Sequence, residues 1–170
     1  TGARNIKRAF TSKNMRAMFT VVFLFTFGFT LFTQFLQVFF IEKFSWNQSQ
    51  IGDYFAYIGL WIAITQGLIT RNLAKKYTPG QVLSFSLFGL SLAIWATFLP
   101  TKGWMTFAIG PFIAVFNGLS APNSTTIVSS LADESSQGEI LGLNQSVQAL
   151  AQAVPPLLGG VLAGVNIGYP

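Results

Sequence analysis

Charged residues are gathered into short groups along the chain, and long uncharged, mostly apolar stretches lie between them. A helix needs about 20 predominantly apolar residues to span the hydrocarbon core of a bilayer. Five stretches reach this length range, so the pattern predicts five transmembrane helices, at about 17–41, 51–70, 81–99, 104–131 and 137–164. Residues 1–16 are predicted to form a cytoplasmic linker with an amphipathic lead-in, and 17–170 the transmembrane part.

The apolar stretches do not alternate between apolar and polar positions, as MFTVVFLFTFGFTLF shows. Strands of a membrane barrel would alternate in this way over about ten residues. The sequence therefore predicts an all-α polytopic membrane protein. No signal-peptide pattern is expected at the start, because the chain begins with a basic polar stretch.

Polar side chains within four of the five predicted helices gather on one side of each helix. A helix advances about 100° per residue, which places the following residues in four polar stripes: Thr26, Thr30, Thr33, Gln34 and Gln37; Tyr54, Tyr57, Trp61 and Thr65; Asn117, Ser120, Ser124 and Thr125; Asn144, Gln145, Gln148 and Gln152. The third helix differs, because beyond Gln81 its polar residues are Ser and Thr, which can bond to their own backbone.

An amide that faces lipid would leave donors and acceptors unpaired, so the stripes are expected to face protein or a water-filled cavity. The alternative is that they form hydrogen bonds between helices, as polar residues often do in membranes. Four stripes together favour a cavity around which four helices converge while the third stays peripheral. The candidate cavity residues are Gln34, Gln37, Tyr57, Asn117, Gln145 and Gln148.

Prolines interrupt two of the predicted helices. Pro122 lies in LSAPNS, and Pro155 and Pro156 lie in AVPPLLGG. A proline inside a helix removes a backbone hydrogen bond and is tolerated in membranes where other groups replace that bond. These three residues are predicted to bend their helices.

The composition excludes most enzyme classes. The chain has 170 residues, 51% of them apolar and 9% charged, with no Cys and no His. Neither a Ser-His-Asp triad nor a Cys-based metal site can be built from it, so no enzyme activity, cofactor or metal is expected. The net charge of +5 does not predict nucleic-acid binding, because the cations are spread along an apolar chain.

The distribution of cations predicts the orientation in the membrane. Eight of the ten Lys and Arg lie before the first predicted helix or between the second and third, whereas Lys43 and Lys102 lie on the other side. Because cytoplasmic connections carry the excess of Lys and Arg, the N-terminus is expected in the cytoplasm.

Three segments resemble the major facilitator superfamily. GLITRNLAKKY resembles the second-half copy of its loop motif, with Gly67, Arg71, Lys75 and Lys76 at matching positions, although Arg71 replaces an Asp and Ala74 a Gly of the first-half motif. QGEILGLNQSVQALAQAVPPLLGGVLAG is similar to the eleventh helix of drug:proton antiporters of the tetracycline-efflux type. NGLSAPNSTTIVSSL and LFTQFLQVFF are similar to their tenth and seventh helices.

The resemblance implies that the five spans are helices seven to eleven, most of the C-terminal six-helix bundle, and that the N-terminal half and a twelfth helix are missing. It further implies a secondary active transporter of a bacterial inner (plasma) membrane, which exports small, partly apolar compounds by alternating access. Protons would be the coupling ion, bound in the missing half. Glu139 is expected near Arg71, where the pair would latch the cytoplasmic side. The alternatives are an uptake transporter for a sugar or another metabolite, and a scaffold that does not transport.

Overall fold

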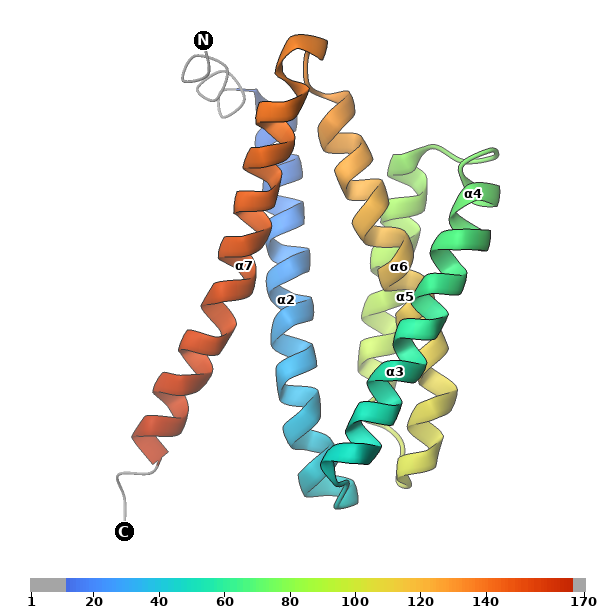
Figure 1. Ribbon diagram of the computed structural model, residues 1–170, viewed down its shortest axis with the longest axis vertical. Coiled ribbons are helices and arrows are strands. Elements are labelled where there is room, and N and C mark those ends of the chain that lie inside the picture. The colour runs from blue at the N-terminus through green and yellow to red at the C-terminus, as the bar shows by residue number, and fades with distance from the viewer. Residues whose placement is uncertain (1–11, 167–170) are drawn as a thin grey trace. The chain divides into compact units, whose positions relative to one another are not determined.

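The computed structural model describes the backbone of residues 12–166 and the side chains of residues 12–157. Its main elements are the helices α2 (Lys13–Phe44), α3 (Gln48–Ile64), α4 (Thr70–Leu73), α5 (Pro79–Ala96), α6 (Thr106–Ser130) and α7 (Gln137–Asn166) (Figure 1). Short 3₁₀ turns at Gly103–Met105 and Glu134–Ser136 precede α6 and α7. The described residues contain no strand, so the predicted all-α class is confirmed.

Three described helical segments are long and apolar enough to cross a membrane: Lys13–Phe44, Pro79–Ala96 and Gly103–Ser130. Helices also cover the other two predicted intervals. There α3 has 17 residues, and α7 carries the amide stripe, which lowers its mean hydropathy. That these two helices also cross the membrane stays a prediction.

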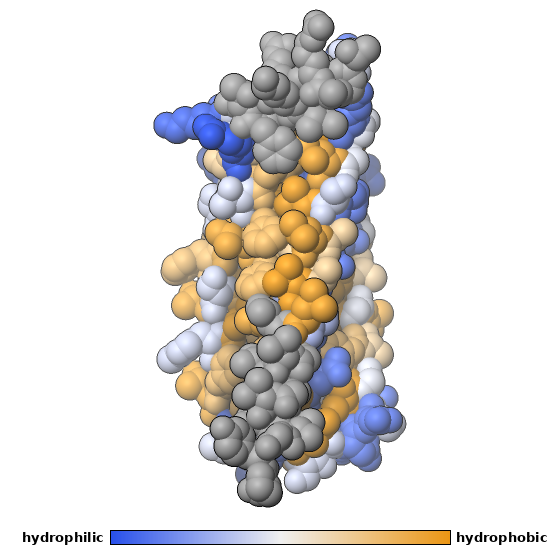
Figure 2. All heavy atoms as spheres, turned by 90° about the vertical axis from the view of Figure 1, so that its left-hand side faces the viewer, coloured by the Kyte–Doolittle hydropathy of each residue, from blue (hydrophilic) through white to orange (hydrophobic). Residues whose placement is uncertain are grey.

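Many large apolar side chains on these helices are exposed. Phe85, Phe88 and Trp95 of α5 are each about two-thirds exposed. Figure 2, which views the α7 side, shows hydrophobic residues across the middle of that face and hydrophilic residues towards its ends. Exposed apolar surface of this extent is unusual for a soluble monomer and suits contact with lipid.

The chain divides into two compact units, each described here by itself. The first unit comprises residues 1–35 and 128–170, and its core joins the start of α2 to the end of α6 and the start of α7. The core residues are Met15, Phe19, Val22, Val128 and Ile140, each at most 5% exposed. Figure 1 shows the start of α2 and the start of α7 side by side.

Residues predicted as a linker contribute to this core. The linker was predicted over 1–16, of which 1–11 lie outside the described residues. From Lys13 onward the chain is already α2, and the Met15 side chain is 3% exposed. Residues 13–16 belong to the predicted amphipathic lead-in, and apolar residues at positions 15, 19 and 22 lie on one face of a helix and can pack together.

The second unit comprises residues 36–127. Within it, α5 and α6 pack closely where Gly89 faces the Phe116 ring, since a Cβ at Gly89 would overlap that ring. One helical turn away, the hydroxyl of Ser120 donates to the hydroxyl of Ser86 at 2.8 Å, and both residues are fully buried. A small residue and a buried hydrogen bond thus hold these two helices together.

An aromatic cluster closes one end of the second unit. After α2 ends, Ser45 takes a left-handed conformation with φ 55°, and Trp46 follows. The ring centroids of Trp46 and Phe40 are 4.5 Å apart, and those of Tyr54 and Phe40 are 4.9 Å apart. Phe107 of α6 completes the cluster, 5.3 Å from Tyr54.

The opposite end of the second unit is the connection between α4 and α5. Thr78 caps α5 in a capping box with Gln81, and Pro79 is the first helical residue. Pro79 and Gly80 both lie inside the helix, because a helix's first residue needs no N–H and proline suits that position.

The helix predicted at 51–70 is longer and less regular than expected. It begins at Gln48, and a five-residue π-helical segment, Thr65–Ile69, separates α3 from α4. At this segment α6 approaches closely, since a Cβ on Gly118 would lie 3.3 Å from the Thr65 side chain. Periodicity cannot predict such an insertion, because it depends on the neighbouring helix.

Candidate functional site

Three candidate cavity residues lie in the first unit. Gln34 of α2 and Gln148 of α7 are half-buried, whereas Gln145 is exposed. Gln145 and Gln148 are three residues apart on α7 and therefore neighbours on its surface. Within the described residues, none of these three amides forms a hydrogen bond to a protein group.

Asn144 is the most buried amide of the α7 stripe, although it was not chosen as a cavity residue. It is 0% exposed, and neither its amide nitrogen nor its oxygen has a hydrogen-bond partner among the described residues. Ile140 and Val147, one turn away on either side, belong to or pack against the apolar core of the first unit. Its place in the stripe was visible in the sequence, but its burial was not.

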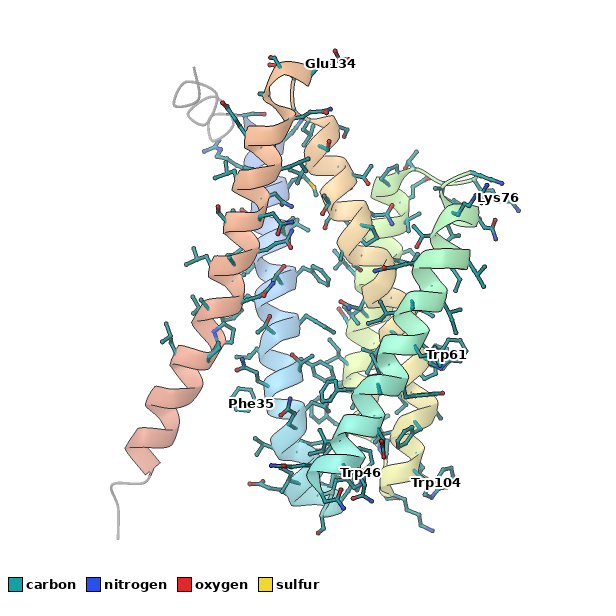
Figure 3. All side chains as sticks on the ribbon, in the orientation of Figure 1. Phe35, Trp46, Trp61, Lys76, Trp104 and Glu134 are labelled. Carbon is teal, nitrogen blue, oxygen red and sulfur yellow. The ribbon has the colours of Figure 1, made fainter. Side chains whose placement is uncertain are left out.

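The other three candidates lie in the second unit. Tyr57 of α3 is half-buried, with its ring 5.5 Å from Phe107 and 6.4 Å from Trp61 between centroids. Asn117 of α6 is half-buried and Gln37 of α2 is exposed. Because the six candidates are divided between the two units, a shared cavity stays a prediction. Trp61, labelled in Figure 3, lies one turn after Tyr57 on α3, so that the two aromatic side chains are neighbours on this helix.

Most hydroxyl groups of the stripes are already paired. Thr33 donates to the Thr30 carbonyl at 3.0 Å, and Thr65 to the Trp61 carbonyl at 2.7 Å. Ser120 belonged to the predicted cavity stripe, but its bond to Ser86 directs it towards α5. For Ser120 the interhelical alternative is therefore correct, and the amides and aromatic side chains remain as the candidate ligand groups.

The three prolines predicted to bend helices lie inside helices that continue past them. Next to Pro122, polar side chains bond the backbone one turn back: the Asn123 amide donates to the Leu119 carbonyl at 2.7 Å, and the Thr126 hydroxyl to the Pro122 carbonyl at 2.9 Å. Pro155 is buried and Pro156 is exposed. Bending at these residues stays a prediction.

The loop-motif residues surround the connection between α4 and α5. Gly67 lies in the π-helical segment, Arg71 in α4, and Lys75 and Lys76 in the turn that follows, all of them exposed. Lys76 is labelled at this turn in Figure 3. Glu139, exposed at the start of α7, belongs to the first unit. Its predicted proximity to Arg71 therefore stays untested.

At the other end of the second unit, the Lys43 side chain of α2 forms a hydrogen bond to the backbone just after α5. Its ammonium group donates to the Phe98 carbonyl at 3.1 Å and lies 4.9 Å from the centre of the Phe39 ring. A cation beside the carbonyls at a helix C-terminus is favourable. Within the described residues, no cluster of three acidic side chains could hold a metal ion.

Long apolar helices, exposed aromatic residues and polar stripes together define an α-helical integral membrane protein. Residues 3–170 match the family model described as Major Facilitator Superfamily. The chain therefore belongs to the major facilitator superfamily, whose members are transporters.

Several characterised relatives are similar at low identity. The chain is 28% identical over 151 residues to major facilitator superfamily domain-containing protein 10 of Mus musculus, covering 86% of this chain and 32% of that protein. It is 27% identical over 154 residues to multidrug resistance protein 2 of Bacillus subtilis, covering 89% and 38%. The class C tetracycline resistance protein of Escherichia coli is 25% identical over 117 residues, covering 69% and 29%.

The chain thus spans about a third of the length of these relatives. No solved structure matches it.

Proposed function

We propose that the intact protein is a secondary active transporter that exports small, partly apolar compounds in exchange for protons by alternating access. The observation that carries this proposal is a set of side-chain amides, on otherwise apolar helices, that have no partners among the described residues. An unpaired amide is costly in an apolar surrounding, so such groups are retained where a ligand or water can bond them. Tyr57 and Trp61 add aromatic surface for the apolar part of a ligand.

The relatives support export rather than uptake. Two of the proteins reported above are named for multidrug and tetracycline resistance. An amide-rich site would also suit a sugar or another hydroxyl-rich metabolite, so uptake is kept as the second candidate. The proposed setting is a bacterial inner membrane, crossed by all five helices with the N-terminus in the cytoplasm.

Alternating access would use two features of the chain. Pro122, Pro155 and Pro156 would let α6 and α7 bend, because each removes a backbone bond from its helix. Arg71 and Glu139 would pair on the cytoplasmic side in one state only.

The test is transport of a fluorescent, partly apolar dye by cells that express the intact protein. We expect lower dye accumulation than in control cells, and a protonophore should abolish the difference. Gln34→Leu and Gln148→Leu should each reduce export about tenfold, since each removes roughly one hydrogen bond to the ligand. Gln137→Leu, an exposed amide at the start of α7, is the matched control.

Unchanged export by the two stripe variants would remove these amides from the site and favour hydrogen bonding between helices. Higher accumulation in expressing cells would support uptake. Equal accumulation with and without the protein, at verified expression, would support the scaffold.

A further inference from the structure

A hollow lies on the surface of the second unit, beside the turn that joins α4 to α5. It has a volume of about 410 Å³ and is lined by Leu73, Tyr77, Gln81, Val82 and Phe85. Pockets that hold small molecules typically measure about 300–1,000 Å³. Most of the lining is apolar, and the Tyr77 and Phe85 side chains are 53% and 65% exposed.

The turn beside the hollow is strongly basic. Lys75 and Lys76 lie between the lining residues Leu73 and Tyr77, and the N–H groups of Lys76 and Tyr77 both donate to the Leu73 carbonyl, at 3.0 and 2.9 Å. This tight turn places both lysines between two lining residues of the hollow. Arg71 lies within one turn of Leu73 on α4.

No carboxylate of the second unit balances these cations. Within residues 36–127, the acidic residues are Glu42 and Asp53, which lie in sequence near Lys43 at the opposite end. Lys75 and Lys76 therefore have no acidic residue of their own unit near them in the sequence. An apolar hollow beside two such lysines is complementary to a ligand with an apolar body and an anionic head.

Gln81 supplies a neutral donor at the same place. Its side-chain oxygen accepts a hydrogen bond from the Thr78 backbone N–H at 3.1 Å, which fixes the orientation of the amide. The NH₂ group of Gln81 therefore has its two donors available at the hollow. These donors suit phosphate or ester oxygens.

We propose that this hollow binds one anionic phospholipid of the cytoplasmic leaflet. An acyl chain lies on Leu73, Val82 and Phe85, while the phosphate contacts Lys75 and Lys76. The cytoplasmic leaflet carries the anionic lipids, and basic pockets at helix ends on that side suit their headgroups. The lining residues of the hollow do not belong to the amide stripes. The site rests on the orientation proposed above but not on the proposed transport activity.

The test is lipid binding to the intact protein in detergent, measured by native mass spectrometry. The probes are palmitoyl-oleoyl phosphatidylglycerol and phosphatidylcholine, which have the same acyl chains and differ in headgroup charge. We expect retention of phosphatidylglycerol in preference to phosphatidylcholine. Lys75→Gln and Lys76→Gln should each weaken phosphatidylglycerol binding about fivefold, from the known strength of one cation at a membrane surface.

Three further variants separate this site from general surface charge. Lys13→Gln removes a cation from the same predicted side but from the other unit, and it should leave binding unchanged. Gln81→Glu keeps an acceptor for the capping box but places a carboxylate at the mouth, and it should abolish the preference for the anionic lipid. Phe85→Ala should weaken binding, whereas Phe88→Ala, equally exposed on α5 but outside the hollow, should not.

Three results would overturn the proposal: equal binding of both lipids, an equal effect of Lys13→Gln and Lys75→Gln, or displacement of the lipid by inorganic phosphate alone. Helix content measured by circular dichroism identifies any variant that has unfolded. In that event the other lysine variant and Gln81→Glu decide the result.

Discussion

At the scale of single residues, the pairing of each polar side chain distinguishes structure from function. Hydroxyls such as those of Thr33 and Thr65 donate to the backbone carbonyl three or four residues back. Their hydrogen bonds are therefore made within one helix and need no neighbouring helix. An amide has two donors and two acceptor sites and cannot be satisfied in this way. Asn144 is fully buried and its amide has no partner among the described residues. We therefore expect this residue to lower the stability of the protein while serving its function.

We predict that Asn144→Leu stabilises the purified protein and impairs transport. Removing an unsatisfied buried amide relieves a cost of about 1–3 kcal/mol, and transport should fall if the amide bonds the ligand. Thermal unfolding in detergent and the dye assay measure the two effects. Gln145→Leu, at an exposed position, should change stability little.

Asn144→Val, with a smaller side chain, separates overpacking from the loss of the amide. If both variants unfold at lower temperature than the parent protein, then Asn144 has a structural partner and this interpretation is wrong.

At the scale of elements, pairs of helices are held by short-range contacts rather than by their apolar character alone. Lipid is as apolar as a leucine side chain, so close packing and hydrogen bonds must bind helices together. In α5 and α6 these contacts are Gly89 on Phe116 and Ser86 with Ser120. The aromatic side chains Phe85, Phe88 and Trp95 of α5 are exposed, and the peripheral role of the third helix stays a prediction.

We predict that Gly89→Ala destabilises the protein by about 1–3 kcal/mol, because the added methyl group overlaps the Phe116 ring and forces α5 and α6 apart. The matched control is Gly59→Ala in α3, where an added Cβ meets nothing within 4 Å. Alanine has the higher helix propensity, so the control should unfold at an equal or higher temperature. Equal destabilisation of the two variants would show that close packing at Gly89 is not required.

At the scale of the whole molecule, two units each carry part of the proposed transport machinery. The second unit holds the basic loop with Arg71, and the first holds Glu139 at the start of α7. A charge pair between separate units can form in one conformation and break in another, as a gate requires.

We predict that Arg71→Glu and Glu139→Arg each reduce transport and that the double variant recovers most of it, since the exchanged charges can pair again. The dye assay at matched expression measures this recovery. Lys75→Glu combined with Glu139→Arg is the control and should show no recovery. A double Arg71 and Glu139 variant no better than either single variant would exclude the pair.

The sequence by itself determined the class of protein and the approximate position of each helix. Charge placement and helical periodicity are local properties, and they persist whatever the neighbouring helices do. Some boundaries differed by a few residues, as at Pro79 and Gly80, which precede the predicted start at about residue 81 but lie inside α5.

Only the tertiary structure decided which polar residues are already paired. Ser120 and Asn117 belong to one predicted stripe, yet Ser120 bonds Ser86, 34 positions away, whereas the Asn117 amide has no partner within the part of the chain that the structure describes. The burial of Asn144, the close approach of Gly118 to Thr65, and the hollow beside Lys75 and Lys76 are equally invisible in the sequence. The physical reason is that periodicity fixes the direction of a side chain around its own helix, while its partner depends on which other helix packs there.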